Sequence, residues 1–186
     1  NLKSYEHVLR GQWHFDQFSR TANDEAIACF RKAVAIDPHN AYALAWLALS
    51  HINRWCTDFS VDDLRYGVGL AAQAIKIDPT DARCFLTCGW GQLWTHGLEA
   101  AKVLLDQAIA LNPSETDALA DRALASAYEC ETAEARNWLA RATALNPIPP
   151  LCCGETKSVV EFVDGRYAEA LPGLETFPDG AWEMMY

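Results

Sequence analysis

The residues that first suggest chemistry are two thiols spaced for one face of a helix. Cys84 and Cys88 are four residues apart, and His96 follows them in the sequence. Residues four apart on an α-helix share a face, and thiolate and imidazole are ligands that zinc prefers. A structural zinc site, however, closes with four ligands that usually come in short-spaced pairs. Two thiols and one distant histidine therefore favour buried packing over a metal site.

The remaining reactive residues form no recognisable catalytic arrangement. Cys152 and Cys153 are adjacent, and neighbouring cysteines seldom form a disulfide. The five histidines are scattered, and the sequence contains no His-Glu-x-x-His, no Gly-x-Ser-x-Gly and no glycine-rich phosphate loop. The carboxylate pair Asp62 and Asp63 is explained by a helix start, where acidic groups interact favourably with the helix dipole. We therefore predict no enzyme, no cofactor and no metal in this chain.

Composition narrows the classes of partner. The chain has 186 residues, 51% of them hydrophobic, and a net charge of −10 from 25 acidic and 15 basic side chains. Such a surface is a poor match for phosphate groups, so nucleic acid and anionic membranes are disfavoured as partners. The seven cysteines are an odd number, and several lie in apolar helical patterns, which fits a reduced cytoplasmic protein. The first residues have neither an initiator Met nor a signal-peptide layout, so we expect a fragment of a longer protein.

One hexapeptide recurs four times and marks the helical repeat in which the residues discussed above lie. It occupies 33–38, 74–79, 108–113 and 142–147, and it ends each time in Asp-Pro or Asn-Pro. Proline cannot continue a helix and pushes the residue before it out of the α region, so each copy marks a helix end. The position numbers of successive prolines differ by 41, 34 and 34. The hexapeptide therefore marks a repeat with a basic period of about 34 residues, a length typical of helical repeat proteins.

Small residues recur at fixed places in the same repeat. Before each stop, alanines are seven residues apart, as in the pairs Ala26 and Ala33, Ala101 and Ala108, and Ala135 and Ala142. After each stop, the eighth residue of the next helical pattern is small: Ala48, Gly89 and Ala123. Together with the period, this pattern resembles the tetratricopeptide repeat (TPR). The resemblance implies an all-α, right-handed α-solenoid of antiparallel helical hairpins, with helix A touching helix B at the small eighth residue.

The pattern predicts five hairpins within one solenoid domain covering residues 1–186. The expected helices are 5–18 and 22–36, 41–55 and 62–77, 82–95 and 98–111, 116–129 and 132–145, and 151–164 and 167–176. A cap helix or truncated sixth repeat is expected over 179–186. Because the first interval between prolines is longer than the other two, seven extra residues are expected in a loop around 55–63, closed by Ser60 as a helix N-cap. That loop is either a binding element or is held down by Trp55 and Phe59.

Three segments resemble a narrower group of proteins. The segments 5–21 and 24–33, together with Leu-Asn-Pro-Ile-Pro-Pro at 145–150, resemble the C-terminal TPR region of bacterial class III adenylate/guanylate cyclases. Related regions follow winged-helix DNA-binding domains in transcriptional regulators. The resemblance implies a non-catalytic module of a signalling protein whose catalytic domain would lie upstream. Relatives are typically aromatic after the double proline, whereas this chain has Leu151, Cys152 and Cys153.

The TPR resemblance also implies where a partner would bind. In this family the concave wall is lined by the first helix of each hairpin, at about its second, fifth, sixth, ninth, twelfth and thirteenth positions. The predicted groove residues are Tyr42, Trp46, Asn53, Arg83, Thr87, Trp90, Trp94, Asp117, Asp121 and Tyr128. In the fifth repeat the same positions include Glu155 and Thr156.

The groove predicted in this way is aromatic in the middle and acidic toward its C-terminal half. Trp and Tyr are favoured anchors for partners, although Trp46, Trp90 and Trp94 could equally pack between hairpins. The asparagine of the carboxylate clamp in chaperone-binding TPRs is replaced in every repeat, which disfavours a chaperone tail. The expected partner is an apolar or basic protein segment, which the parent chain itself could supply. A homodimer through the solenoid ends is the alternative.

Overall fold

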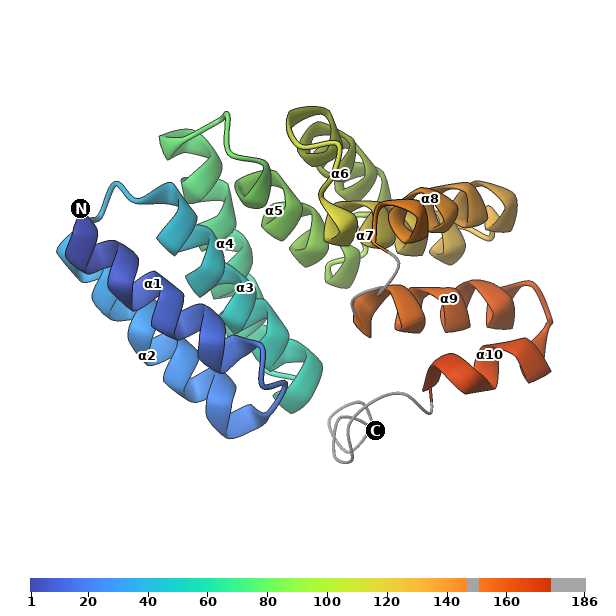
Figure 1. The fold of residues 1–186 in the computed structure, drawn as a ribbon, viewed down its shortest axis with the longest axis horizontal. Helices are drawn as coiled ribbons and strands as arrows, with labels where there is room; N and C mark the ends of the chain where they lie inside the picture. The colour runs from blue at the N-terminus through green and yellow to red at the C-terminus, as the bar shows by residue number, and fades with distance from the viewer. Residues whose placement is uncertain (147–150, 175–186) are drawn as a thin grey trace. The chain divides into compact units, whose positions relative to one another are not determined.

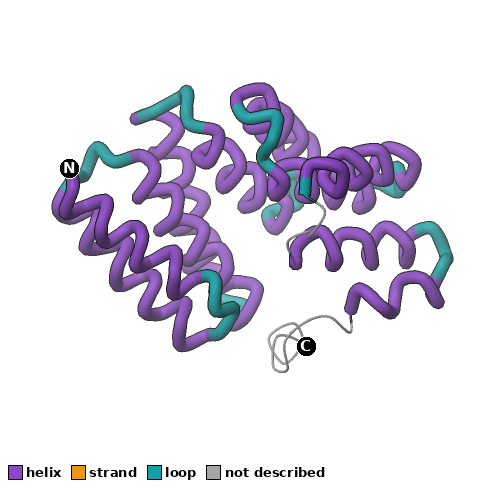
Figure 2. Tube along the Cα trace, in the orientation of Figure 1, coloured by secondary structure: helices purple, strands orange, loops and turns teal. Residues whose placement is uncertain are grey.

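The computed structural model describes residues 1–146 and 151–174. This part of the chain is helical throughout, with turns between the helices and no strand (Figure 2). The helices are α1 (Leu2–Phe15), α2 (Arg20–Ile36), α3 (Ala41–Asp58), α4 (Val61–Ile77), α5 (Ala82–Trp94), α6 (Leu98–Leu111), α7 (Thr116–Tyr128), α8 (Thr132–Leu145), α9 (Leu151–Val163) and α10 (Tyr167–Leu174). The all-α prediction is confirmed, while the cap helix expected over 179–186 lies outside the described residues.

The helices group into two compact units, whose boundary falls within α5. The first unit comprises residues 1–91, and the second continues from residue 92 to the last described residue, 174. In the first, α1 packs alongside α2 and α3 alongside α4 (Figure 1). In the second, α7 packs alongside α8 and α9 alongside α10. The single domain remains a prediction.

The helix ends follow the local sequence signals. Helices α2, α4, α6 and α8 end at Ile36, Ile77, Leu111 and Leu145, each followed by the Asp or Asn that precedes proline. Side-chain oxygens cap several helix starts, as predicted for Ser60, whose Oγ accepts from the Asp63 amide at 3.2 Å. Helix α1 lies three residues earlier than predicted, because Asn1 caps it by accepting from the Lys3 amide.

The small residues allow close packing inside each hairpin. A Cβ atom added at Gly67 of α4 would lie 2.8 Å from the carbonyl oxygen of Ala48 in α3. This close approach confirms Ala48, the small eighth residue, as the contact between the two helices. In the second unit, Ala123 and Ala127 of α7 pack with Ala135 of α8 and Val160 of α9.

The seven extra residues do not form the predicted loop. Helices α3 and α4 contain 18 and 17 residues, whereas α5 and α6 contain 13 and 14, so the insertion lengthens the helices. The turn between them is only Phe59 and Ser60. The loop prediction was wrong because residues 54–58 contain no helix breaker and their charges find partners on α2. Arg54 pairs with Asp24, and Asp58 accepts from Arg20 at 3.1 Å.

None of the helices in the described ranges is both long enough and apolar enough to cross a membrane.

Candidate partner-binding surface

The predicted groove residues divide between the two units. Six belong to the first unit: Tyr42, Trp46, Asn53, Arg83, Thr87 and Trp90. Four belong to the second: Trp94, Asp117, Asp121 and Tyr128. We therefore describe the surface of each unit separately.

Trp46 is the centre of an aromatic cluster in the first unit. Its side chain is almost fully buried, with 8% of its surface exposed. Phe30 of α2 stacks on the indole at 5.8 Å between ring centroids, and Phe15 of α1 meets it edge-on at 5.5 Å. The Arg83 guanidinium lies over the ring, 4.9 Å from its centroid. These contacts come from neighbouring hairpins, so the geometry favours packing over anchoring for Trp46.

The other predicted residues of this unit are more accessible, with one exception. Tyr42 is half-buried, and its hydroxyl accepts a hydrogen bond from the Gln12 amide nitrogen at 2.8 Å. Asn53 and Trp90 are also half-buried, whereas Thr87 is fully buried. Tyr42, Asn53, Arg83 and Trp90 therefore keep the exposure that a binding residue needs, and Thr87 does not.

In the second unit, three of the predicted groove residues lie on α7, which packs alongside α9. Asp121 is 7% exposed, Asp117 is half-buried, and Tyr128 is exposed on the last turn of α7. On α9, burial raises the pKa of the Glu155 carboxyl, because the charged form is desolvated. A nearby cation would stabilise the charged form of this carboxyl.

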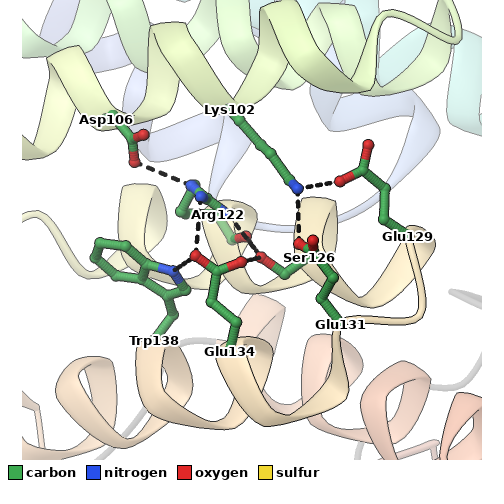
Figure 3. A network of polar contacts seen from close by, with 8 residues as sticks. All are labelled: Lys102, Asp106, Arg122, Ser126, Glu129, Glu131, Glu134 and Trp138. Carbon is green, nitrogen blue, oxygen red and sulfur yellow. Dashed lines mark hydrogen bonds and ion pairs between the residues drawn. The ribbon is translucent and has the colours of Figure 1, made fainter.

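A polar network that the sequence interpretation missed joins α6, α7 and α8 (Figure 3). Arg122 of α7 is buried and donates to Asp106 of α6 at 2.9 Å, to Glu134 of α8 at 3.1 Å and to Ser126 at 2.6 Å. The Trp138 ring lies beneath its guanidinium, at 5.3 Å from the ring centroid. Every polar group in this network faces another one, so it fixes the helices rather than leaving a site for a ligand. An arginine on an apolar helix face was the only sequence signal.

The first unit holds one pair with the geometry of an acid–base dyad. His51 Nδ1 lies 2.6 Å from Asp63 Oδ1. Burial lowers the pKa of His51, and the hydrogen bonds from His51 and Ser60 keep the pKa of Asp63 low despite its own desolvation. His51 Nε2, however, faces Arg31 at 3.5 Å. Because that nitrogen meets a guanidinium rather than a nucleophile, the pair joins α2, α3 and α4 structurally.

The two thiols considered for zinc lie in the packed interior. Cys84 is fully buried and Cys88 is 6% exposed. Burial raises the pKa of the Cys84 thiol to about 12, and it also raises that of Cys88. The Cys84 thiol points at the Ala41 carbonyl oxygen, 3.8 Å away. Both side chains behave as small apolar residues, as the sequence favoured.

Comparison with solved structures identifies the fold as that of TPR proteins. A thermophilic TPR protein of Thermus thermophilus is similar with a TM-score of 0.74 at 18% identity, covering 97% of this chain and 91% of that one. PilW, a type IV pilus biogenesis factor, has a TM-score of 0.71 at 18% identity, covering 97% and 82%. YrrB, described as a TPR protein with an unusual peptide-binding site, has a TM-score of 0.54 at 16% identity, covering 91% and 81%. No protein-family model and no curated protein sequence matches the chain.

Proposed function

We propose that this chain is a non-catalytic protein-binding module whose first helices receive a segment of another protein. The observation that carries the proposal is the combination of TPR-type hairpins with partly exposed Tyr42, Arg83 and Trp90 on their first helices. Aromatic side chains bury much area at low cost in conformational entropy, which makes them effective anchors. YrrB offers a precedent, since a TPR protein of similar fold is described as having a peptide-binding site.

We further propose that the segment is apolar or basic. Asp121 and Glu155 lie on the two helices that pack together in the second unit, and the Glu155 carboxyl is desolvated. A lysine or arginine of the partner would restore the lost solvation of such a carboxylate by a charge-assisted hydrogen bond. Binding would then lower the raised pKa of Glu155 toward its ordinary value.

For the biological context, we propose the regulatory TPR region of a bacterial signalling protein, with an adenylate cyclase as the parent chain. The support is the likeness of residues 5–21, 24–33 and 145–150 to that group. A winged-helix transcriptional regulator is the alternative parent. The gene that encodes the chain distinguishes them, because a cyclase domain or a winged-helix domain would be encoded upstream of Asn1.

A selected peptide tests the binding proposal. Peptides would be selected on the full chain from a displayed random library, and the best one would be fluorescently labelled and titrated by anisotropy. Trp90→Ala and Glu155→Gln should each weaken binding, by roughly tenfold or more for an anchor residue. Tyr66→Ala is the matched control, because Tyr66 is 51% exposed on α4, outside the predicted groove. Unchanged affinity in both groove variants would refute the groove.

A further inference from the structure

The first helix carries an exposed apolar stripe. Leu2, Tyr5, Leu9 and Trp13 are 84%, 52%, 47% and 65% exposed, and they are spaced three and four residues apart along α1. Residues at this spacing share one helix face. Apolar patches of this kind on a protein surface often mark interaction sites. We call these four residues the α1 stripe.

The repeat itself shows what kind of surface the α1 stripe is. In the first hairpin, Gly11 of α1 packs beneath Phe30 of α2. In the next hairpin, Ala48 of α3 packs against Gly67 of α4 in the same way. When Gly11 is aligned with Ala48, each residue of α1 corresponds to the residue of α3 that lies 37 positions later. The α1 stripe residues Tyr5, Leu9 and Trp13 then correspond to Tyr42, Trp46 and Ser50.

In α3 those three positions face the preceding hairpin. Tyr42 accepts from Gln12 of α1 at 2.8 Å, and Trp46 stacks on Phe30 of α2 at 5.8 Å. Ser50 is fully buried, and its carbonyl accepts from the Asn23 side chain of α2 at 3.0 Å. The α1 stripe is therefore the face that, one repeat later in this same chain, packs on the hairpin before it.

The last described hairpin exposes a surface of the complementary kind. Phe162 of α9 and Tyr167 and Leu171 of α10 are 62%, 62% and 58% exposed, and the two aromatic rings meet at 5.4 Å between centroids. Helix α10 is the second helix of its hairpin. The second helices α2, α6 and α8 each pack on the first helix of the following hairpin, α3, α7 and α9 respectively. We call Phe162, Tyr167 and Leu171 the α10 patch.

We propose that two copies of this chain associate head to tail, with the α1 stripe of one copy packed on the α10 patch of the other. The contact continues the pairing of first and second helices that the chain already makes between its own hairpins. The four stripe side chains offer on the order of 400–500 Å², more than half of the roughly 800 Å² that each partner buries in a stable interface. The net charges of the two helices are also opposite in sign. Helix α1 has two basic side chains and one acidic one, a net charge of +1, whereas α10 has one acidic side chain, a net charge of −1.

Such a contact is heterologous, because it joins two different surfaces. Each added copy leaves one α1 stripe and one α10 patch available, so association continues into longer chains unless a ring closes. A second copy is then one partner within the proposed protein-binding function, bound through residues that include none of the ten predicted groove residues. A chain that binds the selected peptide but does not self-associate would refute the head-to-tail contact and leave the proposed protein-binding function standing.

Two complementary variants test it on the full chain by sedimentation velocity over a range of concentrations. The stripe variant is Leu9→Gln with Trp13→Gln, and the patch variant is Tyr167→Gln with Leu171→Gln. We expect the wild-type chain to associate and each variant alone to be monomeric, with a dissociation constant raised by roughly 100-fold. An equimolar mixture of the two should form a dimer and nothing larger, since only one intact pair of surfaces remains. Val103→Gln is the control, because Val103 is an apolar residue that is 66% exposed on α6.

Several results would overturn the proposal. The proposal is wrong if the wild-type chain stays monomeric at the highest concentration. It is also wrong if the control Val103→Gln abolishes association while the stripe and patch variants do not. A patch variant that still dimerises, while the stripe variant does not, would show that the α1 stripe pairs with itself. Far-ultraviolet circular dichroism checks the fold of each variant. If a double variant loses helix, the single changes Trp13→Gln and Tyr167→Gln, both at exposed side chains, give the same comparison.

Discussion

Replacing Trp46 tests whether this residue belongs to the core or to the binding surface. The indole is 8% exposed and is enclosed by Phe15, Phe30 and Tyr42, with Arg83 over its face. Truncating a buried tryptophan to alanine typically costs about 3–5 kcal/mol, because apolar contacts are lost and a cavity remains. We expect Trp46→Ala to destabilise the first unit by an amount in this range.

A second substitution separates packing from hydrogen bonding. The Trp46 ring nitrogen is buried and has no hydrogen-bond partner among the described residues. Trp46→Phe therefore loses volume but no hydrogen bond, and it even removes a donor that is costly to bury unpaired. We expect Trp46→Phe to cost about 1.5 kcal/mol or less. Tyr66→Ala is the control, because Tyr66 is a 51% exposed aromatic residue of the same unit outside the α1 stripe, and surface changes usually stay within about 0.5 kcal/mol.

Hydrogen exchange is the suitable assay, because two compact units need not unfold in a single step. Amides of α3 in Trp46→Ala should exchange faster by about two to three and a half orders of magnitude, the equivalent of the expected loss. Amides of α8 and α9, in the other unit, should change far less. Unchanged exchange in α3, combined with weaker binding of the selected peptide, would refute the packing argument and make Trp46 an anchor.

Three further predictions concern turns, ion pairs and thiols. Cys130 is exposed in a turn with a φ of 62°, a conformation that costs L-residues roughly 1 kcal/mol, so Cys130→Gly should raise the urea midpoint slightly. Arg136 holds the pKa of Glu161 below its ordinary value, and the hydrogen bonds from Thr132 and Arg136 do the same for Asp164. That stability is present above the unfolded-state values of 4.5 and 3.8. It should be lost as the pH falls through the lower folded-state values, and Arg136→Met should flatten this acid dependence of the thermal midpoint. Iodoacetamide at pH 8 should label Cys130 and spare Cys84, whose buried thiol has a pKa of about 12, and mass spectrometry of the digest would reveal the opposite.

The candidate surface was only partly predictable from the sequence. The repeat register placed Tyr42, Arg83 and Trp90 on first helices, and they are half-buried there. The same register could not distinguish Trp46, because a groove position and a packing position differ only in what the neighbouring hairpin places beside them. Arg122 was missed for the same reason, since its partners Asp106 and Glu134 lie 16 and 12 residues away in the sequence.

Helix placement depended mainly on local physics, and the sequence predicted it well. Proline stops and small residues act within a few positions, so the ends of α2, α4, α6 and α8 and the role of Ala48 as the contact with the second helix were readable in advance. The insertion was not readable, because its placement depended on Arg54 and Asp58 finding partners on α2.

By itself, then, the sequence determined that this protein is a series of helical hairpins marked by a recurring proline stop, since that information lies in residues close together along the chain. Only the tertiary structure decided that Trp46 is buried, that α3 continues to Asp58 and that the α1 stripe is exposed. The physical reason is that burial and charge pairing depend on residues far apart in the sequence, which meet only after the hairpins pack.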